Sequence, residues 1–202
     1  MAVADSAVRD GLFLEYRVEG STGPDTTRVS IQRFTFHHQP DGRFEVRLEG
    51  EDVLVGLYTA AYGAPLVVDA ALLATNGVVL QFGGHCPLLL TSARAPDAEV
   101  AWTWDGAGVE ELSSDPQDQI TVKAKLAGPI RWRKWNAWIL RRTDLPPGVP
   151  APVAYYHEAT GVLVGVEYGA DLDQTRFIYC DAELQASSDA DLVAARADDT
   201  RR

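Results

Sequence analysis

The chain has 202 residues, of which 46% are hydrophobic and 23% charged, and its formal net charge is -11. These proportions are ordinary for a globular protein, so they exclude intrinsic disorder for most of the chain and favour one domain with a real core. Because phosphate binding needs a cationic surface, the acidic balance also excludes general nucleic-acid binding.

Strict alternation of apolar and polar residues dominates the N-terminal quarter. Residues 12–18 alternate in the manner of a half-buried strand, and residues 44–49 do the same. A further strand is expected over 28–36. Its apolar residues fall on opposite faces before and after Arg33, so a bulge is expected there. This region therefore predicts three antiparallel strands joined by turns.

The middle of the chain gives weaker signals. Residues 65–73 fit a strand or a short helix, and the Asn76-Gly77 pair is a strong hairpin signal that leads into a strand over 78–82. Residues 99–104 alternate again, and the acidic stretch that follows is typical of a loop.

The C-terminal half adds more strands, and the whole pattern sets the fold class. The expected segments are 120–126, 135–142, 153–157, 162–168 and 175–184. Together they predict a mainly β protein with little helix, built as a curved antiparallel sheet in a half-barrel, barrel or sandwich. We expect an N-terminal extension over 1–11, a single β-rich domain over 12–184, and a polar tail over 185–202. The tail is either flexible or a short helix capped by Ser188.

One segment, residues 119–143, combines cations and tryptophans without any acid. Such a mixture can contact an anionic partner, either an acidic protein surface or a lipid headgroup. The simpler alternative is a solvated strand whose cations pair with the acidic remainder of the chain. Trp135 and Trp138 are three residues apart, so one is expected in the core and the other outside. The candidate ligand-binding or docking residues are Arg131, Trp132, Arg133, Lys134, Trp135, Trp138, Arg141 and Arg142.

No pattern of catalytic or metal-binding residues is present. The chain has no nucleophile elbow, no metalloprotease motif and no phosphate loop. Adjacent residues of a strand diverge, so the tandem His37 and His38 are poor ligands of one metal. The sequence Gly83-Gly84-His85-Cys86 is interpreted as a tight turn rather than a nucleophile with its base. We therefore assign no catalytic residue, metal or cofactor.

The two cysteines and the N-terminus bear on the compartment. Cys86 and Cys180 have no zinc-site spacing and are expected to be free thiols. The first residues have neither a basic start nor an apolar run, and no segment is apolar for long enough to span a membrane as a helix. The expected location is cytoplasmic if the chain is complete as given, and periplasmic if a signal peptide has been removed.

The stretch Ala154–Tyr168, with sequence AYYHEATGVLVGVEY, resembles a hairpin of the bacterial outer-membrane lipoprotein carrier family and related half-barrel domains. In that family the hairpin has the pattern W/YYD-x-x-TGLLL-x-x-E, and an aromatic strand precedes it, as residues 135–142 do here. The resemblance implies a curved antiparallel sheet around an apolar cavity, a lipid-like ligand and no catalytic residue.

Three functional hypotheses follow. The first is a non-enzymatic domain that holds an apolar or amphipathic small molecule in a curved sheet. The second is a structural or docking subunit of a larger assembly. The third is an enzyme whose site is assembled by the fold from His37, His157 and carboxylates.

Overall fold

The structure is a computed structural model, and twelve β-strands dominate its described residues. Those residues are 9–21, 27–41, 44–50, 66–68, 77–79, 85–87, 90, 95–105, 119–147, 151–173 and 176–192. The strands are β1 (Phe13–Ser21), β2 (Thr27–His38), β3 (Phe44–Gly50), β4 (Leu66–Val68), β5 (Gly77–Val79), β6 (His85–Pro87), β7 (Glu99–Asp105), β8 (Gln119–Trp132), β9 (Trp135–Arg142), β10 (Val153–His157), β11 (Leu163–Asp173) and β12 (Arg176–Ser187).

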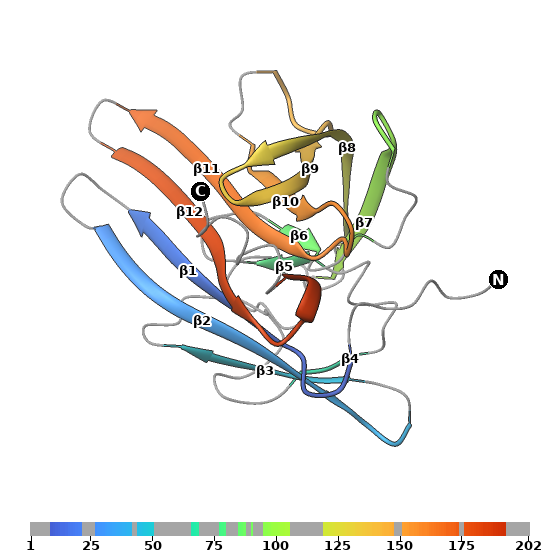
Figure 1. The fold of residues 1–202 in the computed structure, drawn as a ribbon. Coiled ribbons are helices and arrows are strands. Elements are labelled where there is room, and N and C mark those ends of the chain that lie inside the picture. Colours follow the sequence, from blue (N-terminus) through green and yellow to red (C-terminus); the bar gives the residue numbers. More distant parts are fainter. Residues whose placement is uncertain are drawn as a thin grey trace.

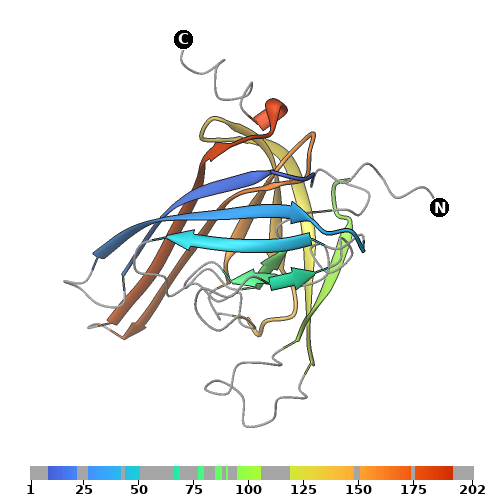
Figure 2. The same ribbon diagram turned by 90° about the horizontal axis from the view of Figure 1, so that it is seen from below.

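Ten of the strands form one antiparallel sheet, so the predicted fold class is confirmed. Their order is β4-β3-β2-β1-β12-β11-β10-β9-β8-β7. Every neighbouring pair in this order is consecutive in the chain except β1 and β12. Two meanders are therefore joined in the middle of the sheet by its first and last strands. The sheet curls but does not close, as Figures 1 and 2 show.

The alternation along β1 shows how the sheet is built. Leu12, Leu14 and Tyr16 are fully buried, whereas Glu15 and Arg17, which alternate with them, lie on the opposite face. We call the face of the sheet that carries Leu14 and Tyr16 the inner face, because it faces the inside of the curl, and the opposite face the outer face. Burying the apolar set in one layer is the main stabilising contribution, at roughly 25 cal/mol per Å² of apolar surface.

The register of β2 differs from the expected one. Its pairing with β1 is regular from Thr27 to Thr35, so the bulge predicted near Arg33 is wrong. The strand keeps a single phase by placing polar side chains inside: Ser30 and Gln32 share the inner face with Phe34 and Phe36. The sequence interpretation assumed that every apolar residue of the segment must be buried.

As a result, the apolar side chains at the start of β2 lie outside. Val29 is 54% exposed and Ile31 is 44% exposed, both on the outer face. They sit across from Glu19 and Arg17 of β1. The charged neighbours Glu19 and Arg17 keep this part of the surface hydrated, and a few exposed apolar residues are normal on a protein surface.

The short central strands β5 and β6 form a separate two-stranded sheet. Figures 1 and 2 place this pair within the curl of the large sheet. The turn of the predicted hairpin includes Asn76, which lies outside the described residues; the described strands on either side belong to different sheets, since β4 pairs with β3 and β5 pairs with β6. His85 and Cys86 belong to β6 rather than to a turn. The side chains of Cys86 and Cys180, and the predicted loop over 106–118, lie outside the described residues.

The two ends of the described chain meet beside β1 and β12. Capping by Ser188 was one of the two alternatives predicted for the tail, and Ser188 does not cap the C-terminal helical turn. Its Oγ accepts a hydrogen bond from Phe13 N at 3.0 Å and donates one to Gly11 O at 3.2 Å. The cap is Asp189, whose Oδ1 accepts from the backbone N–H groups of Asp191 and Leu192. This turn, at 190–192, is the only helix in the described part of the chain, where no helix has the length and apolarity to cross a membrane.

Candidate functional site

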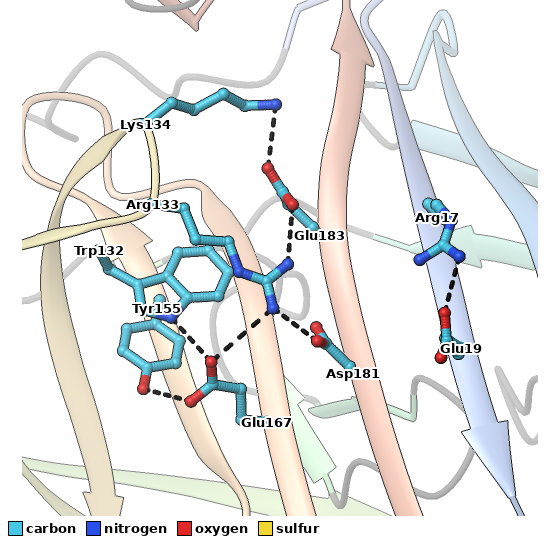
Figure 3. Close-up of polar contacts among 9 residues, drawn as sticks. All are labelled: Arg17, Glu19, Trp132, Arg133, Lys134, Tyr155, Glu167, Asp181 and Glu183. Carbon is cyan, nitrogen blue, oxygen red and sulfur yellow. Dashed lines mark hydrogen bonds and ion pairs between the residues drawn. The ribbon is translucent and has the colours of Figure 1, made fainter.

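The basic and aromatic segment forms the hairpin of β8 and β9, and its tip folds back over the outer face. The register of the two strands shifts between Ala127 and Ile130, which bends the hairpin. Arg133, at the turn, adopts a φ of +50°. Figure 3 shows the side chains of Arg133 and Lys134 extending from the tip toward Asp181 and Glu183 of β12.

We define the hairpin cluster as the side chains that meet at this tip. It consists of Trp132, Arg133, Lys134, Tyr155, Glu167, Asp181 and Glu183 (Figure 3). They come from β8, the turn after it, β10, β11 and β12, so four strands and one turn converge on the cluster.

Trp132 anchors the cluster. Its ring stacks on that of Tyr155, with centroids 4.2 Å apart and planes 11° from parallel. Its Nε1 donates to Glu167 at 2.9 Å, and the Tyr155 hydroxyl donates to the other oxygen of the same carboxylate at 2.7 Å. Gly165 lies directly beneath the Trp132 ring, and a side chain at this position would overlap the ring. The stack is therefore buried and fixed at both polar ends.

Arg133 binds two acids of β12. Its guanidinium donates to Glu183 at 2.7 Å and to Asp181 at 2.5 Å, and it lies 3.8 Å from Glu167. The same group sits over the Trp132 ring at 4.6 Å. Charge-assisted hydrogen bonds of this kind are stronger than neutral ones. Arg133 is therefore engaged by its own chain.

Lys134 and Trp135 extend the cluster inward. Lys134 Nζ lies 3.0 Å from Glu183 and 5.1 Å from the centre of the Trp135 ring. Trp135 in turn meets the edge of the buried His157 at 5.9 Å. This packing shields Lys134 from solvent, so it is a poor contact point for an external anion.

The charges of the cluster alter its acid–base properties. Burial alone would raise the pKa of Glu183, but its hydrogen bonds with Arg133 and Lys134 outweigh that effect and lower the pKa. Burial, and then the hydrogen bond to Glu167, raises the pKa of Tyr155. At neutral pH Glu183 is therefore ionised and Tyr155 is neutral.

The remaining candidate residues of this segment lie in different places. Trp138 and Trp135 face opposite sides of β9 and are both buried, so the expectation that one of them faces outward is wrong. Trp135 packs against Lys134 and the edge of His157, contacts that a single-strand pattern does not reveal. Arg142 pairs with Asp144 at 2.8 Å and lowers the pKa of that carboxyl. Arg131 and Arg141 are exposed, and Arg141 lies directly across from Lys125.

Three of the five predicted cationic contacts, Arg133, Lys134 and Arg142, are thus held by acids of the same chain. The geometry brings Arg133 and Lys134 together with Trp132 and separates them from Arg142. The acids that complete the cluster were missed, because Glu183 and Asp181 are some fifty residues away in the chain and carry no local signal.

Acidification is expected to weaken the fold through the hairpin cluster. The pKa of Glu183 is lower in the folded than in the unfolded state, so its stabilising contribution is present above an unfolded pKa of about 4.5 and is lost as the pH falls through the folded value. Arg133→Gln should reduce this loss. The free energy of unfolding, measured by denaturant titration between about pH 7 and about pH 3, tests this.

Arg47→Gln is the matched control, because it removes a cation from an exposed pair with Glu45 on β3. It should leave the dependence on pH close to that of the parent chain. An Arg133→Gln protein that loses as much stability in acid as the parent does would contradict the role of Glu183.

The inner face offers a different kind of surface. Its side chains on β1 and β12 are apolar or small, among them Leu14, Val18 and Ala182, and the neighbouring β11 adds Val164 and Val166. The polar groups there are buried, and the Tyr16 hydroxyl donates to the backbone oxygen of Leu163 at 2.7 Å. These side chains belong to the buried core of the protein.

His37 and His157, the histidines of the predicted enzyme site, are not brought together. His37 lies on β2 and His157 on β10, so three strands separate them, about 19 Å along the sheet. His157 is buried, and its Nδ1 lies 3.1 Å from Thr160 Oγ1. Within the described ranges, no group of three His, Cys, Asp or Glu side chains is arranged to hold a metal ion.

The chain was compared with protein-family models, with curated proteins and with solved structures, and none of them matches it.

Proposed function

We propose that this protein is a non-enzymatic binding domain that holds an apolar or amphipathic small molecule against the inner face of its curled sheet. The observation that carries the proposal is the shape and lining of that sheet. Ten antiparallel strands curl without closing, and the face inside the curl is apolar. The hydrophobic effect drives binding to such a surface and requires no catalytic group.

The distribution of charge supports the same proposal. Arg17 and Glu19 pair on the outer face at 2.7 Å (Figure 3), and Arg33 pairs with Glu15 on the outer face at 2.5 Å. The hairpin cluster occupies the outer face of β10, β11 and β12. Among the described side chains of β1 and β12, the charged ones therefore lie on the outer face.

An enlarged side chain on the inner face is expected to block the ligand. Ala182 lies between Val18 and Val166 on the inner face, so Ala182→Leu projects extra volume into the curl. The dissociation constant of a neutral fluorescent probe, N-phenyl-1-naphthylamine, should rise about tenfold, because a bulky side chain replaces part of the contact surface. Fluorescence titration measures it.

The control variant is Ile31→Phe, which enlarges an exposed side chain on the outer face. It should bind the probe as the parent does. Thermal unfolding of each variant shows whether the inner substitution is tolerated. The proposal fails if the parent protein does not enhance the probe's fluorescence, or if folded Ala182→Leu binds as tightly as the parent.

For the alternative of a docking subunit, fewer cations are exposed for contact with a partner than the sequence predicted. Lys123, Lys125 and Arg141 are exposed on β8 and β9, and Lys125 and Arg141 are cross-strand neighbours. Lys125 has a long contact of 3.9 Å with the exposed Glu99. An anionic protein surface would contact these exposed side chains more readily than Arg133 and Lys134, because the acids of the hairpin cluster already pair with those two cations.

A further inference from the structure

Three exposed cations differ from the other cations of the sheet in their pairing. The chain has 29 acids for 18 Lys and Arg residues, so a cation readily finds an acid of its own chain. Most cations with a described side chain lie 3.0 Å or less from such an acid: Arg17, Arg33, Arg47, Arg133, Lys134 and Arg142. By contrast, Lys123 and Arg141 form no ion pair with an acid in the described part of the chain, and Lys125 has only its long contact with Glu99.

The three cations form one patch on the outer face, which we call the cation patch. Lys123 and Lys125 flank the buried Ala124 on β8, so both side chains point outward, about 6.6 Å apart along the strand. Arg141 lies directly across from Lys125 on β9. The neighbouring Glu99 carboxylate is 83% exposed and 3.9 Å from Lys125, so solvent screens this contact. The patch is therefore locally cationic on an acidic protein.

This arrangement does not stabilise the sheet by itself. Like charges directly opposite each other on neighbouring strands repel, as the side chains of Lys125 and Arg141 do here. A carboxylate bound between them replaces the repulsion with two charge-assisted contacts, and Arg suits a carboxylate because its guanidinium can donate two parallel hydrogen bonds. The patch thus favours an anionic partner.

The spacing of the patch restricts the shape of that partner. Side chains at every second residue of an extended peptide point the same way and repeat at about 6.6 Å, which matches the separation of Lys123 and Lys125. A membrane surface or a nucleic acid presents many anions to a broad area of the protein, whose net charge of -11 opposes such contact. A single extended segment contacts the patch alone.

We propose that the cation patch is a docking surface for an extended acidic segment of a partner protein, with a carboxylate at every second residue. The patch lies on the face of the sheet opposite the apolar inner face, so the proposal does not depend on the proposed function. Exposed ion pairs are individually weak and are screened by salt, so the complex is transient and sensitive to ionic strength.

The anisotropy of a fluorescein-labelled peptide of alternating glutamate and serine, titrated with the protein, tests the proposal. The parent protein should bind this peptide at about 0.05 M salt but not the same peptide with glutamine in place of glutamate. Lys125→Gln/Arg141→Gln should raise the dissociation constant about fivefold, because it removes two of the three cations.

Arg17→Gln/Arg47→Gln is the matched control. It makes the same change in net charge, but at exposed cations that already pair with Glu19 and Glu45. It should bind the peptide as the parent does. The proposal is overturned if the parent does not bind the peptide at low salt, or if the two double variants weaken binding equally.

Two further measurements identify other occupants of the patch. Cosedimentation of the parent with vesicles of phosphatidylcholine and phosphatidylglycerol, lost in Lys125→Gln/Arg141→Gln, would point to a membrane if the peptide does not bind. Self-association in sedimentation velocity, lost in the same variant, would point to a second copy of the chain. Either result would overturn the proposal of an acidic partner segment.

Discussion

Gly165→Ala is expected to destabilise the fold by about 3 kcal/mol, the upper end of the usual cost of overpacking. Gly165 lies on the outer face of β11, directly beneath the Trp132 ring. A Cβ atom there would overlap Trp132 Cη2, lie 2.6 Å from Trp132 Cζ3, and lie 2.7 Å from the backbone oxygen of Ala182. Neither obstacle yields easily, because the ring is held in its stack and the oxygen belongs to β12.

The denaturant midpoint of Gly165→Ala, compared with that of Gly11→Ala, measures this effect. Gly11 has a φ of +74° and open space where a Cβ would lie, so its substitution costs only the backbone strain, about 1 kcal/mol. Equal losses in the two variants would show that the hairpin tip does not press on β11.

Trp132→Ala should cost about 4 kcal/mol, within the range for deleting a buried aromatic side chain. The substitution removes the stack on Tyr155 and the hydrogen bond to Glu167, and it uncovers Gly165. The free energy of unfolding from denaturant titration measures the loss, and disappearance of the near-ultraviolet dichroism of the stacked rings reports on the same contact.

Ile130→Ala provides the comparison for Trp132→Ala, since Ile130 is a nearby apolar residue of the same strand but is 41% exposed. It should cost about 0.5 kcal/mol or less. The double variant Gly165→Ala/Trp132→Ala should lose less stability than the sum of the two single losses, because removing the ring relieves most of the clash. Full additivity would mean that the two residues do not touch.

Local sequence pattern was sufficient to place most of the strands. The segments predicted at 12–18, 44–49 and 135–142 appear as β1, β3 and β9 with ends that agree within a few residues. These segments alternate because one face is buried, and the period of two is a property of each strand alone. Strand β8 runs six residues past its predicted end, because its hairpin continues beyond the edge of the alternating pattern.

The polar interior of β2 was not predictable in this way. The apolar Val29 and Ile31 suggested a change of face, yet the strand keeps its register and buries Ser30 and Gln32. The register is set by the neighbouring strand and by the larger side chains of Phe34 and Phe36, and these outweigh two smaller apolar residues. The alternation along a strand indicates which face is mostly buried, but it does not identify single polar residues that are buried on that face.

The candidate site shows the same limit in another form. The segment with cations and tryptophans was recognised from its composition, and the alternative of internal pairing with acids was stated. For Arg133 and Lys134 that alternative describes the geometry. Which acids pair with them follows from the folding of the hairpin over β11 and β12, a long-range arrangement that charge patterning along one segment does not contain.

The pairing of β1 with β12 has a consequence for the order in which the molecule assembles. Leu14 pairs with Ser187, so the central ladder of the sheet joins residues from opposite ends of the described chain. The strands from β1 to β3 and those from β7 to β12 are joined by local hairpins that form quickly, whereas this ladder closes the longest loop in the fold. During synthesis the β1–β3 meander cannot complete its central pairing until β12, the last of the described strands, has been made, and refolding is expected to be slow for the size of the chain.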